Sequence, residues 1–182
     1  MVKICFIDRD GVINKLIPRD GITACAPWTL EQFEYLPKVQ EAFYNIKNKG
    51  YIIIIATNQP DVKDGYMTWD NLNAIHNKIR SDFEIDELYM AHTRGAPDYK
   101  PNPGMLLGGL EYYDADPVQC YFIGDSDKDI IAGNRAGINT IWVNDKWLEN
   151  KEWNLKQDYK DKYGDIKPDY ITDSLWRASF LI

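Results

Sequence analysis

Two aspartates lie two residues apart directly after a short apolar run near the start of the chain. Asp8 and Asp10 follow the run ICFI and precede Gly11. Side chains two positions apart in an extended backbone point to the same side of it. Two carboxylates placed in this way repel each other unless a cation joins them or one of them stays protonated. The pattern therefore predicts a site that holds charge and moves protons.

Three further stretches of the chain place polar side chains just after apolar runs. ATNQ (56–59) contributes Thr57 and Asn58, KPNPGM (100–105) begins with Lys100, and IGDSDKD (123–129) contains Asp125, Ser126 and Asp129. In open sheets of parallel strands, ligands bind beyond the carboxyl ends of the strands. We therefore expect all four stretches to meet at one edge of a parallel sheet.

The acids and the lysine predict a metal-assisted reaction at phosphorus. Asp8 and Asp125 would supply the hard oxygen ligands that Mg²⁺ prefers, whereas the sequence has no cluster of cysteine and histidine that would indicate zinc. An ionised Asp8 is also a candidate nucleophile, because carboxylates that attack phosphorus form aspartyl-phosphate intermediates. Lys100 and Mg²⁺ would offset the repulsion between these acids and a phosphate.

The neighbouring residues are expected to bind the phosphate and to move the proton. A protonated Asp10 would protonate the leaving oxygen and then act as base toward water. Thr57 and Asn58 would donate hydrogen bonds to phosphate oxygens. Gly11 would permit a tight turn that brings its backbone to the phosphate. Together, these residues predict phosphoryl transfer to water by positioning and charge neutralisation.

Two residues of the same loop are expected to have supporting positions. Strand alternation predicts that Arg9 points away from both aspartates. Asn14 is expected to fix the loop by hydrogen bonds, with contact to substrate as the alternative. Asp129 falls near the start of an expected helix, where acids are favoured by the helix dipole, so a purely structural role is an open alternative for it.

Short apolar runs alternate with helical patterns along the whole chain, which predicts an α/β fold with helices on both faces of a parallel sheet. Thr68 and Asn102 are candidate helix N-caps, and Gly50 and Gly137 are candidate helix stops. A polar insertion interrupts the alternation at about 144–167, within an expected single domain of residues 1–182. The predicted strands are 2–7, 51–56, 85–92, 118–124, 138–143 and 169–172, and the predicted helices are 37–49, 68–83, 103–113, 127–136 and one beginning at Ser174.

The composition argues against nucleic acid and membranes as partners. The chain has 28 acidic against 21 basic residues, a formal net charge of −7 and 45% hydrophobic residues. Nucleic acids and anionic membranes bind preferentially to basic surfaces. The longest apolar run, YIIIIA, is too short to span a bilayer. Cys5, Cys25 and Cys120 form no CxxC pair, which favours free thiols in a reducing cytoplasm.

The four stretches resemble the signature motifs of the haloacid dehalogenase superfamily of phosphatases, in chain order. Within it, DRDGVIN, TNQ and KPNPGM are similar to the histidinol-phosphatase and heptose 1,7-bisphosphate phosphatase branch. The resemblance implies a three-layer Rossmann-like sheet without a large cap domain. It implies Asp8 as nucleophile, Asp10 as general acid/base, Thr57 and Lys100 as phosphate ligands, and Asp129 as a supporting acid. It places Mg²⁺ on Asp8, Asp125 and the backbone carbonyl of Asp10, with the small Ser126 leaving that site open.

Two departures from that branch concern substrate rather than chemistry. The stretch before Lys100 contains His92 but no cysteine, so we expect no structural zinc. Tyr99 stands where many heptose-bisphosphate enzymes carry an arginine, and Arg94 lies nearby in the sequence. Substrate would then be selected by short loops, at 15–28, 60–67 and 93–99. His76 and His92 are expected to be surface or structural residues. Trp28, Trp147 and Trp153 are expected to pack, with lining of a substrate rim as the alternative.

The main hypothesis is a cytoplasmic, Mg²⁺-dependent phosphomonoesterase acting on a small phosphorylated metabolite, a sugar phosphate or bisphosphate. Histidinol phosphate and a nucleic-acid 3′-phosphate end are alternative substrates, although the acidic balance counts against nucleic acid. A non-catalytic phosphate-binding module on the same fold is the alternative from a different class, because fold alone does not establish activity. A monomer or a small homo-oligomer is expected.

Overall fold

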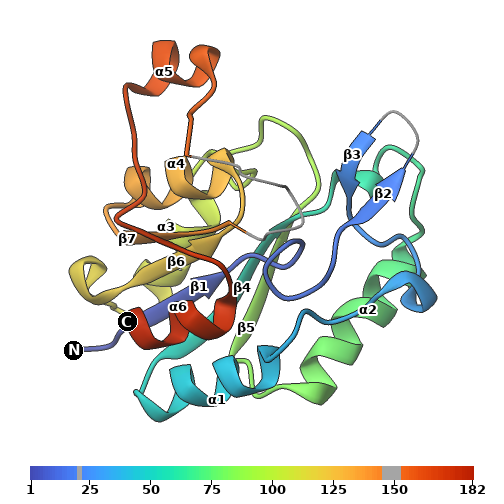
Figure 1. Cartoon of the computed structure of the whole chain (residues 1–182), viewed down its shortest axis with the longest axis horizontal. Coiled ribbons are helices and arrows are strands. Elements are labelled where there is room, and N and C mark those ends of the chain that lie inside the picture. Colours follow the sequence, from blue (N-terminus) through green and yellow to red (C-terminus); the bar gives the residue numbers. More distant parts are fainter. Residues whose placement is uncertain (20–21, 145–152) are drawn as a thin grey trace.

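A six-stranded parallel sheet forms the centre of the protein, whose computed structural model describes residues 1–19, 22–144 and 153–182 (Figure 1). Its strands lie in the order β5-β4-β1-β6-β7-β8, and every neighbouring pair is parallel. The predicted parallel sheet is therefore confirmed. The strands are β1 (Ile4–Ile7), β4 (Ile52–Asn58), β5 (Glu87–Ala91), β6 (Tyr121–Gly124), β7 (Asn139–Val143) and β8 (Tyr170–Thr172).

Helices cover both faces of the sheet and bury its alternating side chains. Cys5 and Ile7 of β1 pack with α1 (Val39–Asn48), α2 (Trp69–Asp82) and α6 (Leu175–Leu181) on one face. Ile4 and Phe6 pack with α3 (Gly104–Tyr112) and α4 (Asp127–Ala136) on the other face. Figure 1 shows the resulting three layers. Because β1 is covered on both sides, it is apolar throughout rather than alternating.

The helix ends follow the sequence signals in most cases. Thr68 caps α2 by accepting a hydrogen bond from the backbone N–H of Asn71, and Gly137 ends α4 with a φ of 74°. The predicted cap at Asn102 is wrong. α3 begins at Gly104, and Asn102 instead donates to the backbone carbonyl of Ala96. The strand predicted from 118 begins at Tyr121, because Pro117–Gln119 forms a 3-10 turn.

Two small additions flank the sheet. An antiparallel hairpin of β2 (Ile17–Arg19) and β3 (Ile22–Cys25) follows the first loop and was not predicted as strands. The insertion carries a short helix, α5 (Gln157–Tyr163), and Trp153 packs on Trp142 of β7 with ring centroids 5.2 Å apart. The prediction for Trp147 lies outside the described residues. Two further 3-10 turns are Leu30–Gln32 and Pro60–Val62.

No helix in the parts of the chain that the structure describes has the length and apolar character needed to cross a membrane. Cys5 and Cys120 are buried free thiols in the two core layers, as the apolar surroundings of both residues in the sequence predict.

Candidate functional site

The predicted residues meet where β1, β4 and β6 end. These three strands are neighbours in the sheet, so the loops that follow them lie side by side at its carboxyl edge. The backbone N–H of Asp8 donates to the carbonyl of Ile123 at 2.9 Å, which continues the pairing of β1 with β6 by one residue. Asp8 therefore occupies a fixed position on the central strand rather than on a free loop.

A tight turn after Asp8 brings Asp10 back toward the sheet edge. The carbonyl of Arg9 accepts hydrogen bonds from the backbone N–H groups of Ile13 at 2.8 Å and Asn14 at 3.2 Å. Gly11 has a φ of 83°, a backbone conformation that favours glycine. A Cβ atom there would lie only 2.1 Å from Oδ2 of Asp125, so the turn also needs glycine for space.

Lys100 joins two buried acids on one side of the site. Its Nζ lies 2.8 Å from Oδ1 of Asp8 and 2.7 Å from Oδ1 of Asp129, and it donates to the carbonyl of Ala56 at 2.9 Å. The other oxygen of Asp129 accepts from the hydroxyl of Ser126 at 2.6 Å and from its backbone N–H at 3.0 Å. This capping box at the start of α4 holds Asp129 beneath the site as a support for Lys100.

Asp129 also depends on the glycine at the end of β6. A Cβ atom on Gly124 would lie 2.2 Å from the Cβ of Asp129, so the close approach of this fully buried acid requires the missing side chain.

The electrostatic environment of Asp8 is negative in spite of Lys100. Burial, followed by the charge of Asp129, raises the pKa of Asp8 to about 7, and Lys100 opposes part of that rise. Burial by itself would lower the pKa of the Lys100 ammonium, but Asp129 and Asp8 together raise it above its ordinary value. Lys100 is therefore a protonated cation held between two acids.

Three carboxylates gather on this side of the site. Ligand oxygens of Asp8, Asp125 and Asp129 all lie within 4.8 Å of one another, with Lys100 as the one ammonium bound among them in the described residues. Asp8 and Asp129 share the single ammonium of Lys100, which leaves these two buried acids with an excess of negative charge. An all-oxygen donor set with such an excess fits a hard divalent cation. We call these four residues the acidic side.

Arg9 corrects one prediction from the sequence. Strand alternation placed its side chain away from the aspartates, yet its Nη2 lies 2.8 Å from Oδ2 of Asp10, and its Nε donates to Oδ1 at 3.1 Å. The prediction failed because β1 ends at Ile7 and the turn around the Arg9 carbonyl reverses the chain. The Arg9 side chain is fully buried.

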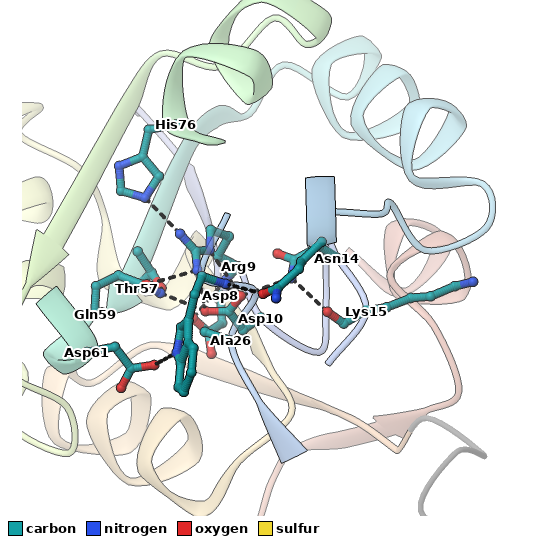
Figure 2. A network of polar contacts seen from close by, with 12 residues as sticks. Asp8, Arg9, Asp10, Asn14, Lys15, Ala26, Thr57, Gln59, Asp61 and His76 are labelled. Carbon is teal, nitrogen blue, oxygen red and sulfur yellow. Dashed lines mark hydrogen bonds and ion pairs between the residues drawn. The ribbon is translucent and has the colours of Figure 1, made fainter. Parts of the chain in front are cut away.

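Two residues that carried no predicted catalytic or binding role complete the surroundings of Arg9, as Figure 2 shows. Nη1 of Arg9 lies 3.1 Å from Nε2 of His76, and Nη2 donates to Oε1 of Gln59 at 2.8 Å. Burial, then the charge of Arg9, lowers the pKa of His76 to about 3, so its ring is neutral and accepts the hydrogen bond from Arg9. His76 is thus a buried structural residue, within the range predicted for it.

Asp10 is held from both sides by this network. Asn14 donates to Oδ1 at 2.9 Å, and Gln59 donates to Oδ2 at 2.6 Å (Figure 2). The hydrogen bond from Asn14 lies within the loop, and the supporting role of Asn14 stays a prediction. The signal that sequence reasoning missed was Gln59, which directly follows Thr57 and Asn58 at the same sheet edge. We call Arg9, Asp10, Asn14, Gln59 and His76 the Arg9 side.

Thr57 and Asn58 end β4 between the two sides. The hydroxyl of Thr57 accepts from Gln59 at 2.9 Å, and its own proton is left to donate. The amide of Asn58 accepts from the backbone N–H of Lys100 and donates to its carbonyl, both at 3.0 Å. Asn58 therefore supports the loop that carries Lys100, and phosphate binding by Gly11, Thr57 and Asn58 stays a prediction.

The three loops predicted to select substrate contact one another beside the site, and we call them the rim loops (15–28, 60–67 and 93–99). Trp28 stacks on Tyr66 with ring centroids 5.2 Å apart and donates to Asp61 at 2.7 Å. Arg94 forms an ion pair with Asp64 at 2.6 Å. Trp28 therefore packs on the second rim loop, which suits both packing and rim lining, and the ion pair places the side chain of Arg94 against the same loop.

Sequence comparison finds hydrolase families and phosphatases similar to this chain. A model described as haloacid dehalogenase-like hydrolase matches residues 25–137, and a second hydrolase-like model matches residues 99–178. A D-glycero-α-D-manno-heptose-1,7-bisphosphate 7-phosphatase of Photorhabdus laumondii is 33% identical over 152 residues, which cover 75% of this chain and 79% of that protein. The Campylobacter jejuni protein of the same description is 32% identical and covers 87% of this chain and 91% of its own length. A Pasteurella multocida phosphatase named for the β anomer is 30% identical, over 79% of this chain and 82% of its own.

Solved structures show the same fold. The crystal structure of the D,D-heptose 1,7-bisphosphate phosphatase from B. bronchiseptica, complexed with magnesium and phosphate, superimposes with a TM-score of 0.76 at 24% identity. The match covers 100% of this chain and 97% of that chain, so the two folds agree over their whole lengths.

Proposed function

Because this chain belongs to the family of haloacid dehalogenase-like hydrolases, we propose that it removes a phosphate group from a small sugar bisphosphate, with a heptose 1,7-bisphosphate as the first candidate substrate. The chain is a phosphatase of that family, a phosphoric monoester hydrolase. The substrate proposal is supported by relatives of this description at 30–33% identity over 75–87% of the chain. Within the chain, the observation that carries the proposal is the pair of Asp8 and Asp10 at one sheet edge.

The acidic side and the Arg9 side would divide the reaction between them. A carboxylate oxygen of Asp8 would attack phosphorus, so that an Asp8–phosphate bond forms while the bond from phosphorus to the sugar oxygen breaks. Asp10 would have to enter the reaction protonated; it would give this proton to the leaving oxygen and regain one from the water that hydrolyses the Asp8–phosphate bond. The hydroxyl of Thr57, the Asn58 amide and the backbone of Gly11 would donate to the phosphate oxygens.

Lys100 would serve the reaction by charge. Its ammonium contacts Asp8 at 2.8 Å, so it lies beside any phosphate that approaches the nucleophile. The contact with Asp129 at 2.7 Å and the support from Asn58 hold it in that position. A fixed cation at this place offsets the repulsion between Asp8 and an incoming dianion without having to reorganise.

The acidic side would hold Mg²⁺ through Asp8, Asp125 and the backbone carbonyl of Asp10. The donor set fits the ion, because carboxylate oxygens of three acids lie within 4.8 Å of one another and two of these acids share one ammonium. When bound, the ion would neutralise charge on the phosphate and orient it for attack. Asp129, which is already bonded to Ser126 and Lys100, would support this set from below.

The rim loops would choose among substrates, because the described part of the chain has no large cap over the sheet edge. Tyr99 is buried beside the start of the Lys100 motif, and Arg94 is paired with Asp64. The stacked rings of Trp28 and Tyr66 hold the first and second rim loops against each other. A compact sugar fits such a rim better than a polymer end, which would need a cationic track along the surface.

We also propose that the enzyme works in the cytoplasm. All three cysteines are free thiols, and two of them are buried in the core, a pattern suited to a reducing compartment.

A phosphate-release screen tests the proposal. The panel would contain both anomers of heptose 1,7-bisphosphate, other sugar phosphates, histidinol phosphate, an oligonucleotide with a 3′-phosphate and p-nitrophenyl phosphate, each with and without Mg²⁺. We expect the heptose bisphosphate to have the highest kcat/KM, and only with Mg²⁺. Faster hydrolysis of histidinol phosphate would overturn the substrate assignment. No hydrolysis of any ester would favour a phosphate-binding module.

A further inference from the structure

Arg9 is a buried charge that protein groups contact on several sides. Its side chain is fully buried, and each of its three guanidinium nitrogens has a protein acceptor: Nε and Nη2 face Asp10, Nη2 also faces Gln59, and Nη1 faces His76. A buried charge is costly unless it is paired and hydrogen-bonded. The catalytic scheme proposed above does not use this residue.

Neutral partners fix the direction of the guanidinium. His76 is buried on α2, its ring is neutral, and Nε2 accepts from Arg9 at 3.1 Å, so its own proton lies on Nδ1. Gln59 accepts from Arg9 at 2.8 Å through Oε1 and turns its Nε2 toward Asp10 at 2.6 Å. These two residues come from different elements, so the plane of the guanidinium is set by α2 and by the end of β4 together (Figure 2).

The result is a carboxylate of Asp10 that is fixed at both oxygens. Oδ1 accepts from Arg9 at 2.9 Å and from Asn14 at 2.9 Å, and Oδ2 accepts from Arg9 at 2.8 Å and from Gln59 at 2.6 Å. A bidentate arginine–carboxylate pair adds geometric specificity as well as energy. The Asp10 side chain is 13% exposed, so it reaches the open edge of the site while its direction is determined from behind.

We infer that Arg9, held by His76 and Gln59, is a positioning residue that aims the Asp10 carboxyl group at the leaving oxygen of the substrate. Proton transfer depends on geometry first, because the donor must lie within hydrogen-bond reach of the oxygen that leaves. Arg9 itself touches no reacting atom in this scheme. The inference rests on the proposed function, because it assumes that Asp10 moves the proton in a phosphatase reaction.

A comparison of two leaving groups separates positioning from simple structural support. The p-nitrophenolate ion leaves without a proton, whereas the alkoxide of a sugar needs one, so only the sugar ester depends strongly on a well-placed Asp10. The parameter to measure is kcat/KM, because it covers the steps up to departure of the leaving group. Loss of folded enzyme lowers kcat/KM for both esters by the same factor, whereas loss of aim lowers it for the sugar ester alone.

The test variants change either His76, which holds Arg9, or Arg9 itself. His76→Leu removes the acceptor of Arg9, His76→Gln restores a neutral acceptor, and Ile79→Val is the matched control on a buried residue of the same helix that lies outside the network. Arg9→Lys provides a second test in case His76→Leu does not fold, because it keeps a cation but loses the planar fork. The probes are heptose 1,7-bisphosphate, or the fastest alkyl phosphate of the panel above, and p-nitrophenyl phosphate.

We expect His76→Leu and Arg9→Lys to lower kcat/KM for the sugar phosphate by about 10-fold or more, within the range of general acid catalysis. For p-nitrophenyl phosphate, the loss should stay below about threefold, and His76→Gln should recover most of the sugar activity. An equal loss on both esters, as expected of Ile79→Val, would overturn the inference while leaving the proposed function intact. A wild-type enzyme that hydrolyses neither ester would overturn both.

Discussion

Asp8 and Asp10 stand two residues apart just after β1, yet their surroundings differ in charge and in contacts. The acidic side brings the carboxylates of Asp125 and Asp129 and the ammonium of Lys100 close to Asp8, and the pKa of Asp8 rises to about 7, chiefly through burial and then through Asp129. The Arg9 side gives Asp10 a guanidinium and two amides that donate to both of its oxygens. The acidic side therefore carries excess negative charge, whereas Asp10 and Arg9 balance each other.

The difference shows how one residue type can perform two tasks. A carboxylate in a cluster with net negative charge is suited to bind a cation. It is also suited to attack phosphorus once that cation is present. A carboxylate whose direction is fixed by neutral amides and one arginine is suited to exchange a proton with a defined oxygen. The contrast makes the two sides separable by experiment.

The largest effect is expected from Asp8→Asn, which removes the proposed nucleophile and leaves the Arg9 side intact. Without a carboxylate oxygen to attack phosphorus, kcat should fall about 10⁴-fold or more, as in other enzymes that lose the nucleophile. Phosphate release from the best substrate of the panel measures the effect. Glu111→Gln, which removes an exposed acid from α3, is the control and should keep most of the activity. Substantial turnover by Asp8→Asn would refute the assignment.

Removal of Lys100 tests the charge balance of the acidic side. Lys100→Met leaves Asp8 and Asp129 buried without their ammonium, and breaking a buried ion pair in this way costs about 3–5 kcal/mol of unfolding free energy. Urea unfolding of the metal-free protein measures the cost. Added Mg²⁺ should recover part of the loss. A cost below about 1 kcal/mol without metal would mean that the acids are not under-neutralised.

Magnesium should stabilise the acidic side and do little to the Arg9 side. An ion that binds only the folded protein adds about 2.7 kcal/mol at a concentration of 100 times its Kd. Thermal unfolding with and without Mg²⁺ measures this gain, and chelation should abolish phosphate release. Asp125→Asn should lose most of the stabilisation, whereas His76→Gln should retain it. An equal gain in all three proteins would place the ion elsewhere.

The two sides should respond to pH with opposite signs in the metal-free protein. The pKa of Asp8 is raised from 3.8 to about 7, so its contribution to stability is complete below pH 3.8 and is lost as the pH rises to 7. The pKa of His76 is lowered from 6.5 to about 3, so its contribution is complete above pH 6.5 and is lost as the pH falls toward 3. Each slope is at most about 1.4 kcal/mol per pH unit.

Unfolding free energies between pH 4 and 8 test this opposition. Asp8→Asn should remove the loss on raising the pH, and His76→Gln should remove the loss on lowering it. Saturating Mg²⁺ should suppress the Asp8 component, because a bound cation favours the ionised acid. Identical pH profiles for the wild type and both variants would show that the two sides do not titrate as described.

The smallest effect is expected at the rim, where an ion pair is exposed. Arg94 and Asp64 lie 2.6 Å apart like the buried pairs of Lys100, but their side chains are 59% and 28% exposed. Exposed pairs contribute about 0.2–1 kcal/mol, so Arg94→Ala should change the unfolding free energy by less than about 1 kcal/mol. The comparison with Lys100→Met then isolates burial as the cause of the difference.

The sequence was informative wherever one local signal agreed with the tertiary structure. Buried strands of a parallel sheet are uniformly apolar, so runs such as YIIIIA predicted β4, and the capping residue Thr68 predicted the start of α2. The convergence of Asp8, Lys100 and Asp125 followed from the rule that loops of parallel strands meet at one edge.

The failures arose where distant residues determine the result. The direction of Arg9 depends on a turn closed by its own carbonyl and on His76, 67 residues further along the chain, neither of which strand alternation describes. The β2–β3 hairpin, by contrast, was missed although the sequence carried a local signal for it, the Asp-Gly pair at 20–21 between two short apolar stretches. Asn102 was assigned as a cap from its type and from Pro103 after it, but its Nδ2 donates to the carbonyl of Ala96 and its Oδ1 accepts from Arg135.

The central place of β1 in the sheet also affects which parts of the enzyme can unfold locally and which can change its substrate range. β1 lies between β4 and β6 and is hydrogen-bonded on both edges, up to the bond from Asp8 to Ile123. Amides in such a strand exchange with solvent only when much of the domain unfolds, whereas two-stranded hairpins open by local fluctuation. We therefore expect the β2–β3 hairpin of the first rim loop to open locally without unfolding of β1, which precedes the proposed nucleophile. Substitutions in this hairpin should likewise leave β1 in place. A new substrate range requires a different rim, and the chemistry beneath it can stay the same.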